Sequence, residues 1–583
     1  MNHEKMTQQI MQLMFKQLKT EELRAKLFVI FMTLLSIGTS FMYFFVHFSV
    51  DGNLKLLRHL SNLSEDQIKY QNALVSNAVL ARNILMAFIA LTTFVFVMFY
   101  YRFFRSNMKQ LGVLKALGFT DQVICRQFLY FTSMLSLTGG VIGLIGGFFV
   151  SDTLMNAGRE SYMITEQVKG ISLSSVLIGI GLPLFVFNIA TYITYAMIRG
   201  KEVAGLIIEN NDSAKKSRWL MAVNHLSEKL PKKNRLPMRL ALRKPISVLL
   251  IIISVMSFSV MFILAYSLNL SSTKVVDSQL VGHHYLYETQ FDQIQTMKAD
   301  DPAALYYLSA ETFLQKGQDK VTRTITGIEA PTEAPTAIFE LLNKEGNVIR
   351  PPVQNEMIIG VELQELHGFK TGDIVKTDVD GCEQEYVISA IAENATMNQV
   401  YVSRDTLCRQ MQLSTDSYNG AFSMNDLHKG TLTITDAKKR DALKRSTVSN
   451  KTSAVINQVM GCFIGCILLF LALYLNFSSS TREMLILHLM GYQIKEIKAM
   501  LLDLYRPILC LSFIVTLIPS VLLVKHILKS LSVQIGDYMP FQTNVFVIVG
   551  IFLLLNLIYF LVQATFHLGI RRIIRKEDIS WFV

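Results

Sequence analysis

Charged residues are scarce in this chain. Asp, Glu, Lys and Arg make up 17% of the 583 residues, whereas 51% are hydrophobic and the mean hydropathy is +0.35. This balance is too apolar for a soluble protein of such a length. The composition therefore predicts a membrane protein.

Charge is missing above all from eight apolar segments. Each has about the 20 residues with which a helix crosses roughly 30 Å of hydrocarbon. Without an ionisable side chain well inside any of them, a proton- or sodium-coupled carrier is disfavoured; Asp503, the nearest candidate, stands beside Arg506 near a helix end. The expected spans are 27–49, 84–101, 128–150, 171–198, 246–268, 453–477, 507–524 and 543–566.

The sequence also lacks the motifs of catalysis and of tight ion binding. No G-x-x-x-x-G-K-[ST] loop is present, since the glycine pair Gly368 and Gly372 has no lysine after it. H-E-x-x-H, G-x-S-x-G and zinc-type Cys/His spacings are missing as well. We expect no catalytic residue, metal site or cofactor on this chain, and we interpret His283-His284 as an ordinary surface pair.

Lys and Arg are distributed unevenly among the loops that flank the spans. Thirty lie in the N-terminal segment, the loops 102–126, 199–244 and 478–506, and the C-terminal tail, against eight in the three short loops on the other side. Positive loops stay in the cytoplasm, so both termini are expected there. The net charge of +11 follows from this bias and from contact with lipid headgroups, and it does not indicate nucleic-acid binding.

One large polar segment, residues 269–452, is then expected outside the cytoplasm. Gly372-Asp373 and Asp380-Gly381 are turn signals between β-rich stretches, which predicts an α+β domain. Its Cys382 and Cys408 fit a disulfide or two free thiols equally well. The expected strands include Val321–Ile328, Glu356–Val361, Ile374–Thr377 and Tyr386–Ile391, and the expected helices are Ala334–Asn343 and Asp436–Ser446.

The remaining segments are expected in the cytoplasm. Residues 1–26 fit an amphipathic helix on the inner leaflet, or simply a positively charged topology anchor. Residues 203–245 form a basic linker that ends in an interfacial helix, and 578–583 form a tail.

A nine-residue word occurs twice. Leu111–Phe119 and Met484–Tyr492 are 373 positions apart, and the shift places Gly118 on Gly491 and an aromatic residue on an aromatic residue. Each copy leads into a long apolar helix. We therefore expect two four-helix repeats, 27–202 and 246–577, with the α+β domain inserted in the second.

The same shift aligns small residues inside the following helices. Small residues at every fourth position let two membrane helices approach closely. These expected packing positions are Gly139, Gly143 and Gly147 in the first repeat and Ser512, Thr516 and Ser520 in the second.

The two words suit docking on a symmetric partner. In each, the glycine would form a compact turn and the aromatic ring would fill a groove of that partner. A turn that only sets the topology is the alternative. The expected docking residues are Lys115, Gly118 and Phe119 in the first repeat and His488, Gly491 and Tyr492 in the second.

Three stretches resemble the FtsX-like permeases of MacB-type ABC transporters. Lys109–Gly118 with the following glycines is similar to the start of the family's coupling segment, and Arg482-Glu483 opens the second copy in the same way. Glu362–Asp373 and Glu385–Ala392 are similar to its extracytoplasmic core. Two repeats in one chain look like the fused members, related to the bacitracin-resistance permeases; Phe131 and Leu504 stand where the family often has an acidic residue.

The resemblance implies a permease subunit without a conventional channel. A separate cytoplasmic ATPase homodimer would bind ATP and Mg²⁺, and its closure would move the helices and the outer domain. The implied function is export, extraction or detoxification of an amphipathic substrate, such as an antimicrobial peptide or a lipid-linked molecule. The alternative is a signalling protein that controls a cell-wall hydrolase or a sensor kinase.

Overall fold

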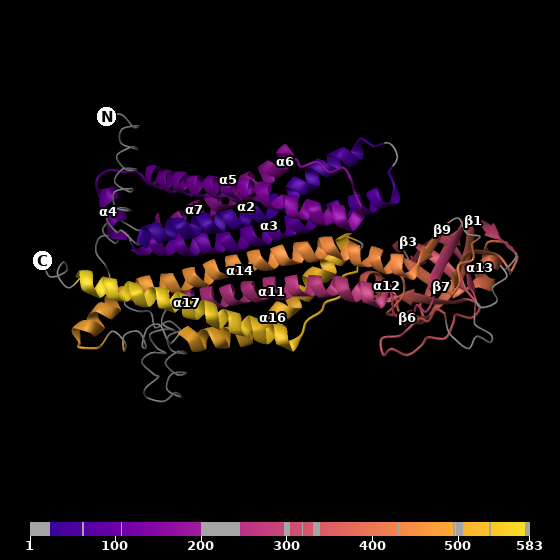
Figure 1. Ribbon diagram of the computed structural model, residues 1–583. Coiled ribbons are helices and arrows are strands. Elements are labelled where there is room, and N and C mark those ends of the chain that lie inside the picture. Colours follow the sequence, from indigo (N-terminus) through magenta and orange to yellow (C-terminus); the bar gives the residue numbers. More distant parts are fainter. Residues whose placement is uncertain are drawn as a thin grey trace.

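A computed structural model gives the arrangement of the chain (Figure 1). It describes residues 24–60, 63–106, 108–199, 245–296, 304–316, 319–329, 338–428, 432–493, 496, 505–535 and 538–577. The expected N-terminal amphipathic helix, apart from its last residues, the linker 203–245, apart from its final residue, and the tail 578–583 lie outside the described residues.

Long helices form a bundle at one end of the molecule, and a β domain forms the other end (Figure 1). Eight of the described helices are long and apolar enough to cross a membrane, as the sequence predicts. The helices of the bundle are α2 (Arg24–Arg58), α3 (Glu65–Ser106), α4 (Met108–Ala116), α5 (Asp121–Tyr162), α6 (Leu173–Val176), the π-helical turn η1 (Leu177–Gly181), α7 (Leu182–Arg199), α11 (Pro245–Ser278), α14 (Asp436–Leu489), α16 (Tyr505–Ile535) and α17 (Val545–Glu577).

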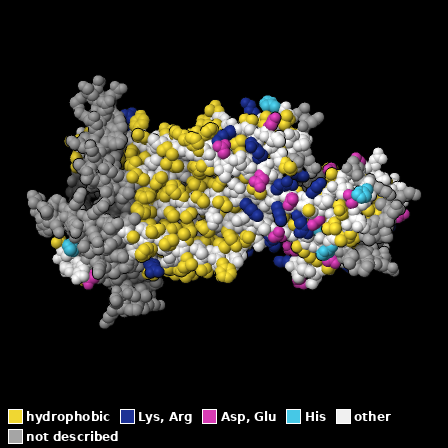
Figure 2. Space-filling view, viewed as in Figure 1, with side chains coloured by type: hydrophobic (Ala, Val, Ile, Leu, Met, Phe, Trp, Pro, Cys, Tyr) yellow, Lys and Arg dark blue, Asp and Glu magenta, His cyan; other side chains and the backbone are white. Residues whose placement is uncertain are grey.

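A belt of hydrophobic side chains crosses the face of the bundle that Figure 2 shows. Large apolar side chains stay exposed on several helices of the bundle, among them Phe149 on α5 and Ile518 on α16, at 70% and 69% exposure. Lys, Arg, Asp and Glu gather beyond the belt, toward the β domain. An exposed apolar surface of this kind requires lipid contact, so the chain is a multi-pass membrane protein.

Several helices are longer than the expected spans. The helices α2 and α3 extend past their apolar parts to Arg58 and from Glu65, and form a hairpin. The longest helix, α14, has 54 residues, which is about 80 Å at 1.5 Å per residue. It begins directly after the last strand, so one continuous helix crosses the expected boundary at 452/453 between the α+β domain and its next span.

The two halves of the bundle pack on each other through matching pairs of helices. The helix α5 contacts α14 of the other half, and α16, which follows the second turn, contacts α3 in the same way. Phe31 of α2 stacks on Phe470 of α14 with ring centroids 4.5 Å apart. One apolar core cluster therefore extends through both halves.

The β domain is a closed sheet with a short extension. Six strands close into a barrel in the order β3-β7-β4-β6-β5-β2, because β2 pairs both with β5 and with β3; β8, β1 and β9 continue from β2. Its elements are β1 (Tyr287–Gln295), β2 (Leu305–Lys316), β3 (Asp319–Ile328), β4 (Glu356–Gly360), α12 (Val361–His367), β5 (Ile374–Val379), β6 (Cys382–Ala392), β7 (Gln399–Ser403), α13 (Arg404–Gln410), β8 (Tyr418–Ser423) and β9 (Leu432–Thr435).

The expected strands are confirmed, and their turn chemistry is visible. Asp380 and Gly381 join β5 to β6 with φ of 50° and 84°, the two left-handed residues of a two-residue hairpin. The expected helix at 334–343 is wrong for its described part, because Phe339 and Leu342 form β-bridges with His283 and Val348. The backbone of that segment pairs with the rest of the domain instead of with itself.

The two cysteines of the β domain are free thiols. Cys408 is fully buried in the barrel core, and burial raises the pKa of its thiol. Cys382, at the start of β6, is partly exposed. Of the two alternatives that the sequence left open, the structure has two unpaired thiols.

Candidate functional site

The first repeated word ends a helix with a Schellman motif. The amide of Phe119 donates to the carbonyl of Leu114 at 3.1 Å, and the amide of Gly118 donates to that of Lys115 at 3.0 Å. Gly118 has φ +90°, a conformation that costs a side chain but not glycine. The turn between α4 and α5 is therefore fixed by its own sequence.

The second word forms the same turn at the end of α14. The amide of Tyr492 donates to the carbonyl of Leu487 at 3.1 Å, the amide of Gly491 donates to that of His488 at 3.0 Å, and Gly491 also has φ +90°. Every one of these residues lies 373 positions after its counterpart. The repeated word is thus a repeated local structure.

The aromatic residues of both turns face the protein itself. Phe119 and Tyr492 are half-buried and pack against the core cluster of the bundle. The most exposed apolar side chain is Leu117 in the first turn, at 70%, and Met490 in the second, at 68%; Val113 and Leu489 are exposed as well. Leu117 and Met490 also correspond under the 373-residue shift, and sequence reasoning missed them because it read the ring as the outward residue.

Lys115 and His488, the other expected docking side chains, differ in their polar contacts. The ammonium of Lys115 lies 2.9 Å from the carboxylate of Asp121, which also accepts a hydrogen bond from the hydroxyl of Tyr195 at 2.8 Å. Lys115 therefore ties α4 to α5. His488 is half-buried, and its Nδ1 has no hydrogen-bond partner.

The three glycines of α5 lie directly against α2. A Cβ added to Gly139 would come within 2.5 Å of the Cβ of Ser36, one at Gly143 within 2.9 Å of the amide of Phe41, and one at Gly147 within 2.8 Å of the Cβ of Phe44. No side chain fits at such distances. The helix after the first turn is therefore packed backbone to backbone on its neighbour.

The second half makes its close approach with a different pair of helices. Ser512, Thr516 and Ser520 are buried in α16. However, the glycine contacts are those of α14 on α11, where a Cβ at Gly461 would lie 2.7 Å from Met261 and one at Gly465 would lie 2.3 Å from Phe258. The two halves share their turns and differ in which helices are in tightest contact.

The segment that holds the first turn and the glycine row matches a known family. Residues 83–203, from α3 to α7, match the model of the FtsX-like permease C-terminal domain. This segment is similar to the FtsX-like permease domain, which in ABC transporters is the non-catalytic membrane part. No curated protein matches the chain.

The far end of the permease domain touches α14. The amide of Ser449 donates to the hydroxyl of Ser161, near the end of α5, at 3.0 Å. The first turn thus reaches α14 through the 42 residues of α5, and the second turn lies at the end of α14 itself. The first turn, through α5, and the second turn, through α14 itself, are therefore both connected to the part of α14 that enters the β domain.

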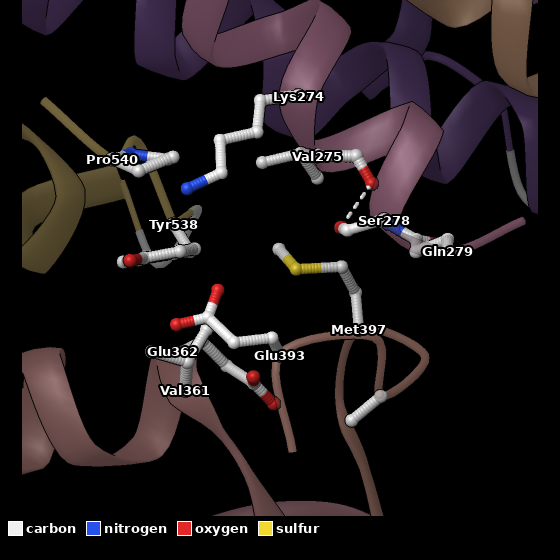
Figure 3. A pocket seen from close by; sticks show the side chains of 11 residues that line it. Lys274, Val275, Ser278, Gln279, Val361, Glu362, Glu393, Met397, Tyr538 and Pro540 are labelled. Atoms are coloured by element: carbon white, nitrogen blue, oxygen red, sulfur yellow. Dashed lines mark hydrogen bonds between the residues drawn. The ribbon is translucent and has the colours of Figure 1, made fainter. Parts of the chain in front are cut away.

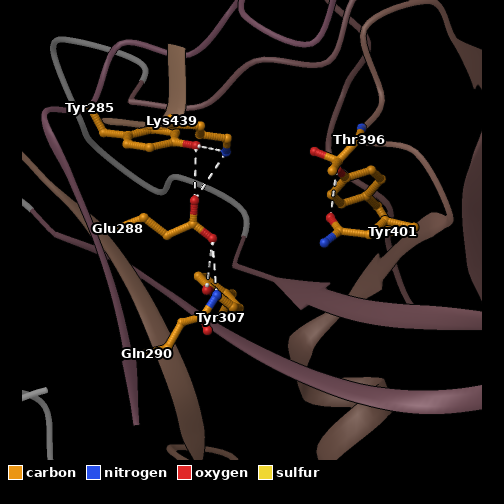
Figure 4. A network of polar contacts seen from close by, with 8 residues as sticks. Tyr285, Glu288, Gln290, Tyr307, Thr396, Tyr401 and Lys439 are labelled. Carbon is orange, nitrogen blue, oxygen red and sulfur yellow. Dashed lines mark hydrogen bonds and ion pairs between the residues drawn. The ribbon is translucent and has the colours of Figure 1, made fainter. Parts of the chain in front are cut away.

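A partly buried ionic network fastens α14 to the β domain (Figure 4). The ammonium of Lys439, one turn into the helix, donates to Glu288 on β1 at 3.0 Å and also to the hydroxyl of Tyr285. The hydroxyl of Tyr307 on β2 donates to the other oxygen of Glu288 at 3.3 Å. Burial, with the neighbouring Glu288 carboxylate, raises the pKa of both tyrosines.

His283 belongs to the same region and is not a surface residue. It is 6% exposed and stacks on Tyr285, with 5.4 Å between ring centroids. Burial, and then the charge of Lys439, lower its pKa to about 3. The sequence prediction of a surface pair holds only for the exposed His284, and nothing in the local sequence marks His283 as buried or Lys439 as partly buried.

The described residues offer no metal-binding chemistry. Nowhere in the described ranges do three or more His, Cys, Asp or Glu side chains come together closely enough to hold an ion. The arrangement of two matched turns, continuous helices and a fastened β domain can transmit a displacement.

Proposed function

We propose that the chain is the permease subunit of an ABC transporter and that its two turns dock on a separate cytoplasmic ATPase homodimer. ATP and Mg²⁺ would be bound by that partner. The observation that carries the proposal is the second Schellman turn, which repeats the turn of the FtsX-like permease domain residue by residue. A twofold partner needs two such sites, and a duplicated chain provides them.

The charge distribution supports an orientation. With thirty Lys and Arg in one set of loops and eight in the other, both turns and both termini face the cytoplasm. The β domain, at the opposite end of the bundle (Figure 1), lies outside. A movement of the turns would then be carried across the membrane by α5 and α14.

The position of the β domain supports a class of substrate. A zone of charged side chains lies between the apolar belt and the β domain, so a substrate that passes from the membrane to this domain would have one apolar and one polar part. An antimicrobial peptide or a lipid-linked molecule meets this description. The second candidate, a signalling protein without transported substrate, is favoured by the Lys439–Glu288 link, because a fastened domain would move a bound hydrolase or sensor kinase equally well.

Docking is tested at the two exposed side chains. A charge in a desolvated interface costs more than truncation of the side chain, and loss of a central contact is worth about 2 kcal/mol, or roughly 30-fold in affinity. We expect Leu117→Asp and Met490→Asp each to weaken co-purification of the ATPase by about that factor, and the double variant to abolish it. Val348→Asp in the β domain, 59% exposed, is the matched control.

The aromatic residues give a second, separable readout. Phe119→Ala and Tyr492→Ala should loosen the turns, because the rings pack on the chain's own core. We expect weaker assembly or ATP hydrolysis that no longer responds to substrate, with normal membrane insertion. If the Leu117/Met490 double variant keeps its ATPase and remains fully coupled, the turns only set the topology.

A further inference from the structure

A single carboxylate oxygen joins three helices at the first turn. Asp121 is the first residue of α5, and its Oδ1 accepts a hydrogen bond from the hydroxyl of Tyr195 on α7 at 2.8 Å. The same oxygen lies 2.9 Å from the ammonium of Lys115 on α4. Lys115 is also the residue whose carbonyl accepts from the amide of Gly118 in the Schellman motif. The turn cannot open without moving Lys115, so its shape depends on Asp121.

Tyr195 is the firmly held side of this link. The residue is 3% exposed. Its ring packs against Phe104 of α3 and Phe128 of α5, with ring centroids 5.6 Å and 6.4 Å apart. Because the ring is fixed by its neighbours, its hydroxyl is a fixed donor for the carboxylate of Asp121.

The same face of α7 is bonded to α5 at two further points. The hydroxyl of Thr191 lies 3.0 Å from that of Thr132, and the hydroxyl of Ser133 donates to the amide oxygen of Asn188 at 3.1 Å. Positions 188, 191 and 195 are spaced by three and four residues, which places them on one side of a helix. Hydrogen bonds between side chains hold membrane helices together, so α5 and α7 move together with the first turn.

The second turn has no carboxylate at the corresponding position. The 373-residue shift places His488 on Lys115 and Ile494 on Asp121, and an isoleucine side chain accepts no hydrogen bond. The backbone bonds of the two turns are the same. The second turn is therefore an internal comparison for what Asp121 adds to the first.

At the other end of the helices, the junction with the β domain is closely packed (Figure 3). The hollow between α11, α12, the β6–β7 loop and the α16–α17 linker has about 20 Å³ of free space, which is room for about one or two water molecules. Tyr538 and Pro540 line it from the linker, and Glu362 and Met397 line it from the domain. A displacement of the helices therefore reaches the β domain through direct contact.

We propose that Asp121 is the positioning residue of the first turn. It holds α4, α5 and α7 at one point, so that the turn has its docking shape before the ATPase binds. A displacement of the turn then passes to α5 and α7 together. The inference deepens the proposed function, and it rests on that function for the identity of the partner.

The link is tested in the full chain alone, by hydrogen exchange of the turn amides in detergent. Tyr195→Phe removes the donor and keeps the ring in its place. A hydrogen bond to a charged acceptor is worth roughly tenfold in an equilibrium constant, so the amides of Gly118 and Phe119 should exchange about tenfold faster. Unchanged exchange at these two amides would overturn the proposal.

Two controls accompany this measurement. Tyr192→Phe removes a hydroxyl from a side chain of α7 that is 49% exposed, and it should exchange as wild type does. The amides of Gly491 and Tyr492 in the second turn should be unaffected by Tyr195→Phe. Faster exchange in both turns would mean that the substitution loosens the whole bundle, which contradicts a local positioning role.

A double-mutant cycle on co-purification of the ATPase separates positioning from direct contact. Lys115→Met and Asp121→Asn break the same pair, and each should weaken co-purification roughly fivefold, the upper range for a partly exposed pair. The double variant should be no worse than the stronger single one, and Lys115→Arg, which keeps the charge, should bind as wild type does. Additive losses would show that each side chain contacts the ATPase itself, and the proposal would be wrong.

The proposed docking and the role of Asp121 fail separately. The exchange measurement needs no ATPase, so unchanged exchange in Tyr195→Phe removes the role of Asp121 and leaves docking as it stands. If the Leu117/Met490 double variant keeps its ATPase, the turns are not docking sites. Faster exchange in Tyr195→Phe would then identify a purely structural link, and Asp121 would position no docking surface.

Discussion

The α5 glycines pack directly against the backbone of α2. Gly143 lies so near α2 that a methyl group would be 2.9 Å from both the Phe41 amide and the Ser40 Cβ. Backbone atoms cannot turn away as a flexible side chain can, so the helices themselves have to separate.

Gly143→Ala is therefore expected to destabilise the bundle. Overpacking costs roughly 1–3 kcal/mol, which outweighs the helix-propensity gain of about 1 kcal/mol from replacing glycine. Gly550→Ala in α17 is the matched control, because nothing lies within 4 Å of its added Cβ. Thermal unfolding in detergent should show a lower midpoint for Gly143→Ala and an unchanged or higher one for the control; equal midpoints would mean that α2 and α5 are not in tight contact.

Glu362 makes stability depend on pH. Burial raises the pKa of its carboxyl to about 7 from 4.5, so the folded state holds the proton more tightly than the unfolded chain. This stabilisation is complete below about pH 4.5 and is lost as the pH rises through 7, a change on the order of 3 kcal/mol. Glu362→Gln should remove it.

The measurement is the unfolding midpoint of the β domain within the full chain, followed by tyrosine fluorescence at pH 5.5 and pH 8. The advantage of Glu362→Gln over wild type should be larger at pH 8. His283 acts in the opposite sense, because its lowered pKa destabilises the fold as the pH falls below 6.5. Comparing variant and wild type at each pH cancels that term, and a pH-independent difference would count against a buried, protonated Glu362.

Residues of the repeated motif could be predicted from the sequence. Contacts between residues that are far apart in the sequence could not. Gly118 and Gly491 were recognisable because each stands in the same word, and their φ of +90° follows from what only glycine tolerates. Leu117 and Met490 carried the same signal and were overlooked. Lys439 and Glu288 are 151 positions apart, and no periodicity indicates that such a pair is formed.

The helix α14 extends from the β domain to the second turn. Its first turn is fastened to the β domain through Lys439, its N-terminal part touches α5 at Ser449, and its end forms the second turn. A rigid helix of this kind transmits axial and tilting movements without a hinge.

Lys439→Met should release the β domain from α14. Removing one partner leaves the Glu288 carboxylate, whose side chain is 14% exposed, without its counter-charge, which costs about 3 kcal/mol or more. We expect faster hydrogen exchange in β1 and in the first turns of α14, with ATPase docking unchanged. Lys438→Met, on the neighbouring exposed position, should exchange as wild type does; identical exchange in both variants would show that the network does not hold the helix.

Element type was predictable where a pattern was strong and local. Eight apolar runs gave eight membrane helices, and the Asp380-Gly381 signal gave its hairpin. The ends of α14 were not predictable, because Asp436–Ser446 read as a helix of the domain and 453–477 as a span, with nothing to show that they are one. At 338–343 a long-range β-bridge, from Phe339 to His283, and a local one, from Leu342 to Val348, override a helical pattern.

For the whole molecule, orientation is the first quantity to measure. Cys382 is partly exposed and Cys408 is buried, so a membrane-impermeant maleimide should label the β domain at Cys382 alone. We expect labelling in intact cells that disappears in Cys382→Ser and persists in Cys408→Ser. Labelling only after the membrane is permeabilised would place the β domain in the cytoplasm and reverse the proposed direction of coupling.

The position of the β domain has a further consequence. In the first half, α2 and α3 are joined at their tip by six residues, 59–64; in the second half, the chain leaves α11 at Ser278 and returns in α14 at Asp436. The helices α11 and α14 pack side by side, so the domain enters and leaves the bundle at neighbouring points. A module attached in this way can be exchanged for another, or shortened to a plain turn, without any change in the spacing of the helices. The packing of the membrane helices and the two Schellman turns is therefore independent of which module stands between α11 and α14.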